Sequence, residues 1–346
     1  MLAIMRKTLL IGAAVFLGLA VAASLFFGLR YYFDNKAPNF RDVYTLYVYP
    51  GTSPDEVTDS LIAGAGAIRK GSVRRCAASE LADGLKPGKY EVRPEYPAVY
   101  VMRMIANGWQ TPQNLTLSGT IRSRGRLAAM IGRQMMADSA SVASALADSV
   151  FLAGYGFTPE TVFALFLPDT YEMYWTATVG EIFDRFRKEY DAFWTPERVA
   201  LAGRQGLSPL EVSVMASIVS GETLQQKEYP MIAGVYLNRL HKGMKLQADP
   251  TVCFCFDYTL DRVLKKHLKI DSPYNTYKYK GLPPAPINVP PKACIDAVLN
   301  PDEHGYMFFC ASPEFDGTHR FAVTYSEHLR NAREFQRALT ARSKAQ

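Results

Sequence analysis

Residues 208–226, SPLEVSVMASIVSGETLQQ, carry the clearest secondary-structure signal in the chain. Ser208 and Pro209 suit the N-cap and the first position of a helix, and Glu211 completes a capping box with the serine. Apolar side chains then recur at spacings of three and four, at Leu210, Val214, Met215, Ile218 and Val219. The pattern predicts a helix that packs an apolar stripe against a core.

Glu222 occupies the next position on that stripe, four residues after Ile218 and three after Val219. A carboxylate beside apolar surface is partly desolvated, which raises its pKa. A raised pKa is what a general acid needs near neutral pH. Gly221 loosens the helix at this point and leaves room for a bulky substrate. The alternative is that Glu222 is simply the solvated end of the helix, and the pattern leaves both interpretations open.

The N-terminus contains a long uncharged segment, Thr8–Leu29. At about 1.5 Å per residue, a helix of this length reaches about 33 Å and could cross a hydrocarbon core. A cleaved signal peptide is the alternative, since Ala20-Val21-Ala22 resembles a cleavage site, but the apolar run continues well past it. We expect a retained single-pass anchor. Arg6 and Lys7 favour a cytoplasmic N-terminus, which places the residues after Arg30 outside the cytoplasm.

Composition limits the number of domains and the kinds of ligand that we expect for this chain. The chain has 346 residues, of which 48% are hydrophobic and 21% charged, so it can form about two packed domains. The net charge of +6 is spread along the chain, and no basic run with interleaved aromatics indicates nucleic-acid binding. The five histidines lack metal-ligand spacing, so we expect no metal and no cofactor. The five cysteines are expected to be small buried hydrophobes, although a disulfide is an alternative for Cys253, Cys255, Cys294 and Cys310.

The segment after the anchor predicts a small unit of alternating strands and helices. Val43–Tyr49 has the composition of a strand, and Ser53 is placed to cap a helix starting at Pro54. A second strand at Tyr90–Val92 and a helix at Ala98–Asn107 complete the unit. Further along, helical spacing is expected over Arg122–Ala137, Gly180–Trp194 and Tyr229–Lys242, and the aromatic-rich Phe163–Tyr174 is expected to be a packed loop.

The sequence resembles one known family over nearly all its length after the anchor. Residues 220–223, SGET, are followed at 228–252 by EYPMIAGVYLNRLHKGMKLQADPTV, which closely resembles the endolytic murein transglycosylases, the bacterial inner-membrane enzymes of the YceG-like family. Shorter matches to the family are LKPGKY (85–90), FLPDTY (166–171), SPYNTY (272–277), GLPP (281–284) and GTHRF (317–321). The resemblance is strongest over residues 214–290.

This resemblance implies an α+β fold and a division into five parts. The catalytic domain would carry its glutamate on a helix, and a small LysM-like subdomain would precede it. The parts are a cytoplasmic tail (1–7), a transmembrane helix (8–29), a linker (30–42), a LysM-like subdomain (43–112) and a YceG-like catalytic domain (113–346).

The resemblance also implies a reaction, cleavage of the β-1,4 bond between N-acetylmuramic acid and N-acetylglucosamine without water. Hydrolytic glycosidases generally need two carboxylates. A lytic transglycosylase instead uses the 6-hydroxyl of the sugar as nucleophile, so Glu222 alone could act as acid and then as base. The product would end in a 1,6-anhydro ring. Many members have Glu-Lys-Glu-Thr where this chain has Ser220-Gly221-Glu222-Thr223, which leaves open whether Ser220 alters the rate.

The expected substrate-binding residues combine family motifs with side chains that can donate and accept hydrogen bonds. Gln247, Asn275, Thr276 and Tyr277 could hold acetamido and hydroxyl groups, and Thr223 completes the Glu-Thr pair. Asp249 precedes a proline and suits either a turn or a polar contact with the sugar. Loop structure is the alternative for each of these residues, and Asn238 and Arg239 are expected to brace their helix.

Partners and location follow from the same resemblance. The expected substrate is the nascent glycan strand of peptidoglycan, the expected protein partners are cell-wall synthases of the penicillin-binding class, and the catalytic domain would be periplasmic. Two alternatives stay open. One is a non-catalytic, membrane-anchored scaffold that binds peptidoglycan, and the other is a lysozyme-type hydrolase with Asp249 as its second carboxylate.

Overall fold

The computed structural model describes residues 1–345, which divide into two compact units. Unit 1 comprises Met1–Asn114 with Glu172–Thr176, and unit 2 comprises Leu115–Tyr171 with Ala177 onward. Helices predominate, and the strands form small two-stranded sheets. The fold is therefore mixed α+β, as predicted, with an apolar helix at the N-terminus.

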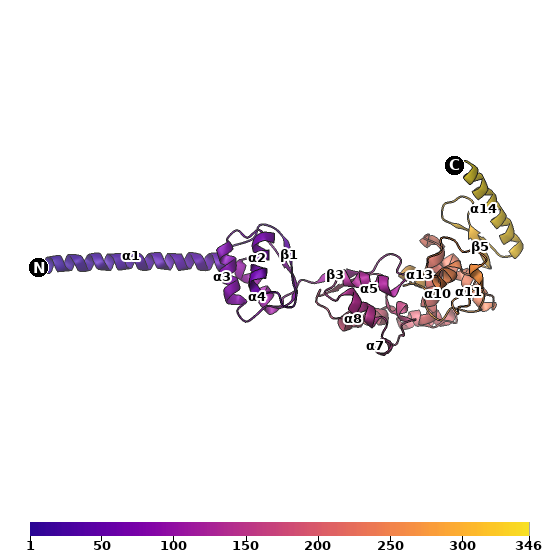
Figure 1. Cartoon of the computed structure of the whole chain (residues 1–346), viewed down its shortest axis with the longest axis horizontal. Coiled ribbons are helices and arrows are strands. Elements are labelled where there is room, and N and C mark those ends of the chain that lie inside the picture. The colour runs from indigo at the N-terminus through magenta and orange to yellow at the C-terminus, as the bar shows by residue number, and fades with distance from the viewer. Residues whose placement is uncertain (346) are drawn as a thin grey trace. The chain divides into compact units, whose positions relative to one another are not determined.

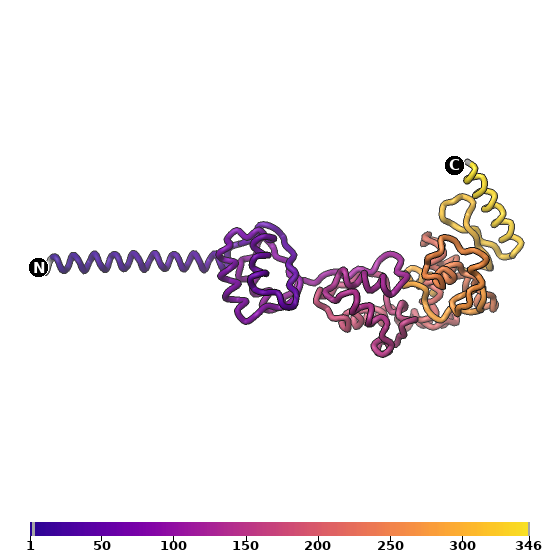
Figure 2. The backbone as a smooth tube through the Cα atoms, viewed as in Figure 1, coloured from indigo at the N-terminus to yellow at the C-terminus, as the bar shows by residue number. Residues whose placement is uncertain are grey.

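Unit 1 begins with α1 (Leu2–Asn35), a continuous helix of 34 residues that is unbroken in the backbone trace (Figures 1 and 2). By length and composition, Ile4–Asn35 could cross a membrane. The helix extends past both ends of the predicted span 8–29. It also occupies the start of the predicted linker 30–42, in which Asn39 is fully buried.

Between residues 44 and 107, the unit contains two antiparallel strands and three helices. β1 (Tyr44–Val48) pairs with β2 (Gly88–Val92), with Tyr44 opposite Val92. Alternate residues of both strands are buried in the core of the unit, as a half-buried sheet requires. The helices that share this core are α2 (Pro54–Gly64), α3 (Lys70–Glu80) and α4 (Ala98–Asn107).

The elements predicted for this unit are confirmed, but α3 was missed. Ser53 caps α2 in a capping box with Glu56, and α4 has the predicted bounds. The sequence of α3, KGSVRRCAASE, buries small residues, Val73, Cys76 and Ala77, and therefore gives a weak apolar pattern. The predicted strand-helix-strand-helix unit thus has one more helix between its strands.

Unit 2 is built mainly from short helices. Its strands β5 (Phe308–Ala311) and β6 (His319–Ala322) pair in antiparallel register. β3 (Gln113–Thr116) and β4 (Thr170–Met173) also pair, and each of these two strands crosses the boundary between the units. The helices, with 3-10 turns marked η, are α5 (Arg124–Gly132), α6 (Ser139–Ala145), α7 (Ser149–Ala153), η1 (Val162–Leu165), α8 (Val179–Phe193), α9 (Pro196–Arg204), α10 (Pro209–Glu222), η2 (Gln226–Glu228), α11 (Tyr229–His241), α12 (Asp249–Cys255), η3 (His267–Lys269), α13 (Lys292–Leu299) and α14 (Tyr325–Ala345).

Helix α10 lies at the centre of the core of unit 2. It packs against α11, α12 and α13, and every residue from Val212 to Val219 is buried. The burial therefore extends all round this part of the helix, further than the predicted stripe. The two serines in this buried stretch are accommodated because their hydroxyls donate to backbone carbonyls: Ser213 to Pro209 at 3.1 Å and Ser217 to Val214 at 2.7 Å.

Two further expectations need correction or completion. Phe163–Tyr174 is packed, with Phe163 and Phe166 buried, but it contains η1 and β4 and is not a loop throughout. Cys253 and Cys255 lie on a helix, α12. All five cysteines are free thiols, so the disulfide alternative is wrong.

The cap of α10 gives a stability test. The Ser208 hydroxyl accepts a hydrogen bond from the Glu211 amide, and the Glu211 carboxylate accepts one from the Ser208 amide at 2.8 Å. We expect Ser208→Ala to lower the free energy of unfolding by about 1 kcal/mol. Ser208→Asp keeps an acceptor and should retain most of the stability. Urea unfolding of residues 31–346 measures both, and equal losses for the two variants would contradict the capping role.

Candidate active site

Glu222 is the last residue of α10, and its carboxylate lies where the buried core meets the surface. Glu222 is partly exposed, as is Ser220, and Gly221 is exposed, whereas Val212–Val219 are all buried. Tyr236, on α11 and 1% exposed, donates its hydroxyl to Glu222 Oε1. This contact fixes one carboxylate oxygen and leaves the other for a ligand or a proton.

The environment raises the pKa of Glu222 to about 7. Desolvation by the surrounding core is the main cause, and the negative charge of Asp249 raises the pKa further. The hydrogen bond from Tyr236 and the positive charge of Arg239 act in the opposite direction. Both protonation states of Glu222 are therefore accessible near neutral pH, as an acid that must also act as a base requires.

Asp249 is brought toward Glu222 by close packing at the start of α12. Gly221 contacts Pro250, and a Cβ at position 221 would lie 2.6 Å from the Pro250 Cβ. Tyr277 donates its hydroxyl to Asp249 Oδ1 at 2.6 Å, which fixes that carboxylate. Gln247, just before α12, has a φ of 52°, an unusual conformation for a residue other than glycine.

Three of the predicted residues therefore line a hollow with Glu222. The hollow has a volume of about 250 Å³. Its lining residues are Glu222, Tyr236, Arg239, Gln247, Asp249, Tyr277, Phe309, Cys310, Ala311 and His319.

A second hollow of about 510 Å³ shares Glu222, Ala311 and His319 with the first. The buried Thr223 and the exposed Leu224, which directly follow α10, line this hollow. β5, β6 and α14 supply other parts of its wall. Its remaining lining residues are Gln225, Ser312, Phe315, Gly317, Thr318, Phe335 and Arg342. Glu222 thus lines both hollows, which share part of their walls.

The other predicted substrate-binding residues are engaged by protein groups. Asn275 is fully buried and donates its amide to the carbonyls of Leu268 and Ile270, at 3.0 and 2.8 Å. The Thr276 hydroxyl, also buried, accepts from the amide of Ala248 at 3.0 Å. In the structure these two side chains hold the loops that carry Gln247 and Tyr277, which matches the loop alternative.

Asn238 and Arg239 brace α11, as predicted. Asn238 donates to the carbonyls of His304 and Tyr306, and Arg239 donates to those of Met307 and Leu246, at 2.6 and 2.5 Å. Arg239 also lines the first hollow, so its positive charge acts on the carboxylate of Glu222.

Glu228 is a site residue that sequence reasoning missed. Its Oε1 accepts from the backbone amide of His319 at 2.8 Å, and its Oε2 lies 2.9 Å from His319 Nδ1. The Thr223 hydroxyl donates to the same carboxylate at 3.2 Å. Glu228 thereby joins Thr223, the residue after Glu222, to His319 of β6. His319 lies 91 positions after Glu228 in the chain. The EYPM and GTHRF motifs contain both partners, but no spacing pattern could have paired them.

Ser220, two residues before Glu222, makes polar contacts inside the protein. Its hydroxyl lies 2.9 Å from the Ser217 carbonyl and 3.1 Å from Asn288 Oδ1. Asn288 is 3% exposed and donates to the same carbonyl at 2.8 Å. Ser220 therefore helps to join α10 to the segment before α13. Within residues 1–345, no group of three or more histidine, cysteine or acidic side chains is placed to hold a metal ion.

Comparison with known proteins identifies the family. A model described as the YceG-like family matches residues 46–334. The chain belongs to the YceG-like family. It is 44% identical over 114 residues to the endolytic murein transglycosylase of Bacillus subtilis (strain 168), a match that covers 33% of this chain and 31% of that protein. Over 362 residues it is 24% identical to the endolytic murein transglycosylase of Streptococcus pneumoniae serotype 2 (strain D39 / NCTC 7466), covering 95% of this chain.

The matches span 31% of the Bacillus protein and 65% of the pneumococcal one. Among solved structures, it is similar to a yceG-like protein from Listeria monocytogenes. The TM-score is 0.54 at 26% sequence identity, over 83% of this chain and 98% of the Listeria chain.

The contact between Gly221 and Pro250 gives a test of how this YceG-like site is held together. We expect Gly221→Ala to lower the melting temperature, because the added methyl group must push α10 and α12 apart, which typically costs about 1–3 kcal/mol. Gly203→Ala is the matched control, since Gly203 is also helical but a Cβ there meets nothing within 4 Å. The control should be neutral or slightly stabilising. Equal melting temperatures for the two variants would refute the close packing.

The hydrogen bond from Tyr236 gives a test of the Glu222 environment. Because this bond stabilises the charged carboxylate, Tyr236→Phe should raise the pKa of Glu222 above its value of about 7. Carboxyl titration by NMR with labelled glutamate measures the shift, and Glu222→Gln identifies the resonance. Tyr279→Phe is the control, since Tyr279 bonds to Asp271 at 2.6 Å. A lower Glu222 pKa in Tyr236→Phe would contradict the assigned donor role.

Proposed function

We propose that this chain is a membrane-anchored endolytic lytic transglycosylase that cleaves the bond between N-acetylmuramic acid and N-acetylglucosamine in nascent peptidoglycan strands. The observation that carries the proposal is Glu222, a carboxyl group with a pKa of about 7 that lines two hollows with shared walls. A polymer cleaved in its interior must extend to both sides of the catalytic group, and two hollows meeting at Glu222 suit such a substrate. The names of the relatives agree with this activity.

The proposed reaction uses one carboxyl group twice. Protonated Glu222 gives its proton to the glycosidic oxygen, and the bond from that oxygen to the muramic acid C1 breaks. The 6-hydroxyl oxygen of the same muramic acid then bonds to C1, and its proton passes to the Glu222 carboxylate. The carboxyl group ends protonated, as it began, and the product carries a 1,6-anhydro ring. No water is consumed.

The neighbouring groups suit this cycle. Tyr236 holds one oxygen of Glu222, so the proton is carried by the other. The hydrogen bond is worth most when Glu222 is charged, which stabilises the base form after the first transfer. Gln247, Asp249 and Tyr277 line the first hollow and supply polar groups for sugar hydroxyl and acetamido substituents. Thr223 takes the corresponding place in the second hollow.

The rest of the proposal concerns the surroundings of the enzyme. The apolar α1 serves as the inner-membrane anchor with a cytoplasmic N-terminus, and the catalytic unit works in the periplasm. The strand and helix elements of residues 43–112 form the LysM-like subdomain. Cleavage of nascent strands would help to terminate glycan elongation, which makes cell-wall synthases of the penicillin-binding class the expected partners.

A hydrolase of lysozyme type is the second candidate, and one observation favours it. Asp249 lines the same hollow as Glu222, and its negative charge contributes to the raised pKa of Glu222. A second carboxylate in this place could activate water or form a covalent intermediate. The two reactions differ in the terminal sugar of the cleaved strand. The transglycosylase leaves a 1,6-anhydro end, and the hydrolase leaves a reducing end.

Product analysis tests the proposal directly. Residues 31–346 are incubated with uncrosslinked glycan strands, and the products are analysed by mass. We expect anhydro ends, and we expect Glu222→Gln to lower the rate by about 10²–10⁴-fold, the usual contribution of a general acid. The rate should also fall as the pH rises through about 7, because Glu222 then loses the proton that it donates.

Glu211→Gln is the matched control, since it makes the same change on the same helix and glutamine can still complete the capping box. Reducing ends that disappear in Asp249→Asn would favour the hydrolase. No cleavage by the unmodified protein would support the alternative of a non-catalytic, peptidoglycan-binding scaffold.

A further inference from the structure

Unit 1 contains a cluster of polar side chains, separate from the candidate active site in unit 2. It lies where α1 joins the folded part of unit 1. The apolar run of α1 ends at Leu29, but the helix continues to Asn35. These last six residues add about 9 Å at 1.5 Å per residue, so they extend beyond a hydrocarbon core that is spanned by Thr8–Leu29. Tyr31 and Tyr32 are 62% and 53% exposed in this turn, at the depth where aromatic residues favour the membrane–water interface.

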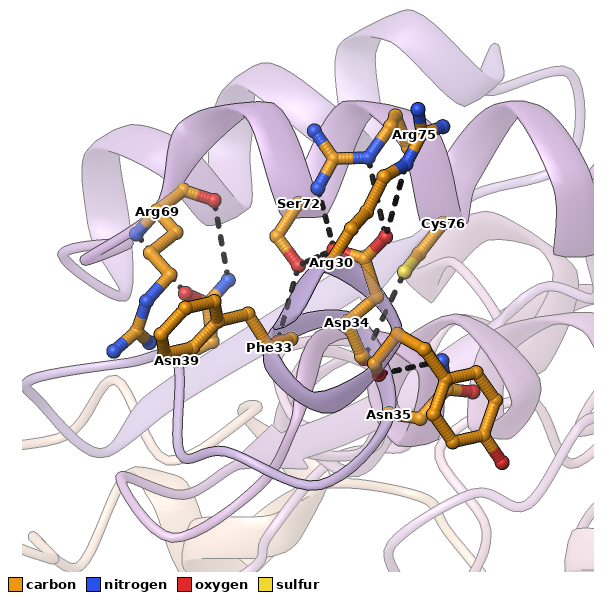
Figure 3. Close-up of polar contacts among 10 residues, drawn as sticks. Arg30, Phe33, Asp34, Asn35, Asn39, Arg69, Ser72, Arg75 and Cys76 are labelled. Carbon is orange, nitrogen blue, oxygen red and sulfur yellow. Dashed lines mark hydrogen bonds and ion pairs between the residues drawn. The ribbon is translucent and has the colours of Figure 1, made fainter. Parts of the chain in front are cut away.

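The end of α1 is fixed to α3 by Asp34. Its carboxylate accepts hydrogen bonds from Ser72 Oγ at 2.6 Å and from Arg75 Nη2 and Nε at 2.6 and 3.1 Å (Figure 3). The two bonds from Arg75 form a bidentate pair, which restricts direction as well as distance. Asp34 is 9% exposed, so its carboxylate is largely shielded from solvent, whereas the Arg75 side chain remains 38% exposed.

Two further contacts hold the same junction. The guanidinium of Arg69 lies 4.3 Å from the centre of the Phe33 ring, and the Arg69 amide donates to Asn39 Oδ1 at 2.9 Å (Figure 3). Because both ends of the segment between α1 and α3 are fixed in this way, the predicted linker is not a free hinge. The first turns of α3 are therefore fixed to Asp34, which lies five residues after the end of the apolar run at Leu29.

This junction exposes a concentration of positive charge. Lys36, Lys70 and Arg74 are exposed, Arg30 and Arg75 have side chains that are 46% and 38% exposed, and Arg69 is partly exposed. The carboxylate in the cluster, Asp34, is already paired. Glu80, at the opposite end of α3, is paired with Arg103 at 3.0 Å. We define the junction surface as Arg30, Lys36, Arg69, Lys70, Arg74 and Arg75.

We propose that the junction surface binds the anionic headgroups of phospholipids in the leaflet from which α1 emerges. The inference rests on the membrane anchoring proposed above, because only an inserted α1 brings α3 to the headgroup layer. Basic residues that immediately follow a membrane span are attracted by anionic lipid, and the attraction falls off within a Debye length. With α1 fixed to α3, this attraction sets the orientation of unit 1 on the membrane.

Lysine acetylation of the full chain in lipid discs tests the proposal. Discs contain either phosphatidylcholine alone or phosphatidylcholine with phosphatidylglycerol, and rates are measured by mass spectrometry. We expect Lys36 and Lys70 to react about fivefold more slowly with phosphatidylglycerol, the factor for one cation beside an anionic surface. High salt should remove the difference. Lys265 and Lys266, exposed in a loop of unit 2, serve as internal references.

Arg74→Glu should abolish most of the shielding of Lys70, because it reverses an exposed charge of the junction surface and leaves the contact between Asp34 and Arg75 intact. Arg126→Glu, an exposed charge reversal on α5, should leave the shielding unchanged. Equal rates in both kinds of disc would overturn the proposal. So would full shielding in Arg74→Glu, or the same shielding by inorganic phosphate in phosphatidylcholine discs.

The anchoring itself is tested separately by alkaline carbonate extraction of membranes that contain the full chain. Release of the chain would refute the anchor and with it the lipid contact. Retention of the chain together with unshielded Lys36 and Lys70 would refute the lipid contact alone.

Discussion

The site depends on the close approach of two helix ends, the last turn of α10 and the first turn of α12. Gly221 permits this approach, because any side chain there would meet Pro250. The approach brings Asp249 near enough to Glu222 for its charge to contribute to the raised pKa. It also places Gln247 and Tyr277 beside the same hollow, since Tyr277 is fixed to Asp249. The absence of a side chain at Gly221 thus determines where the polar groups of Asp249, Gln247 and Tyr277 lie.

The burial of α10 gives this arrangement its chemical effect. A carboxylate at the end of an exposed helix would keep a pKa near 4.5 and would be ionised at neutral pH. Here the core surrounds the helix almost to its end, so Glu222 is desolvated while it still borders two hollows. Tyr236 and Arg239 counter the desolvation and keep the pKa at about 7. The balance matters because a much higher pKa would weaken the base form that the second proton transfer needs.

Local signals in the sequence predicted much of the fold. The capping boxes at Ser53 and Ser208 fix the starts of α2 and α10, and each depends on residues three positions apart. The position of Glu222 on a buried helix followed from the same periodicity. The missed α3 buries small residues, which leave little apolar pattern. The missed pair of Glu228 and His319 joins residues 91 positions apart, and periodicity carries no information at that distance. The same limit explains why Asn275 and Thr276 were predicted to bind sugar. Amides and hydroxyls can bond to sugar groups or to the backbone, and here both side chains bond to the backbone.

The bond between Glu228 and His319 explains how the C-terminal part of unit 2 contributes to the site. β5 and β6 supply Phe309, Ala311 and His319 to the walls of the hollows, yet they follow α10 by almost a hundred residues. Glu228 accepts from the backbone and approaches the ring of His319, and it accepts from Thr223 next to Glu222. Because the Glu228 carboxylate is 7% exposed, removing any of these partners would leave a buried acceptor without its hydrogen bond. The buried Glu228 carboxylate therefore joins the residue after α10 to β6, while the Glu222 carboxylate remains available for chemistry.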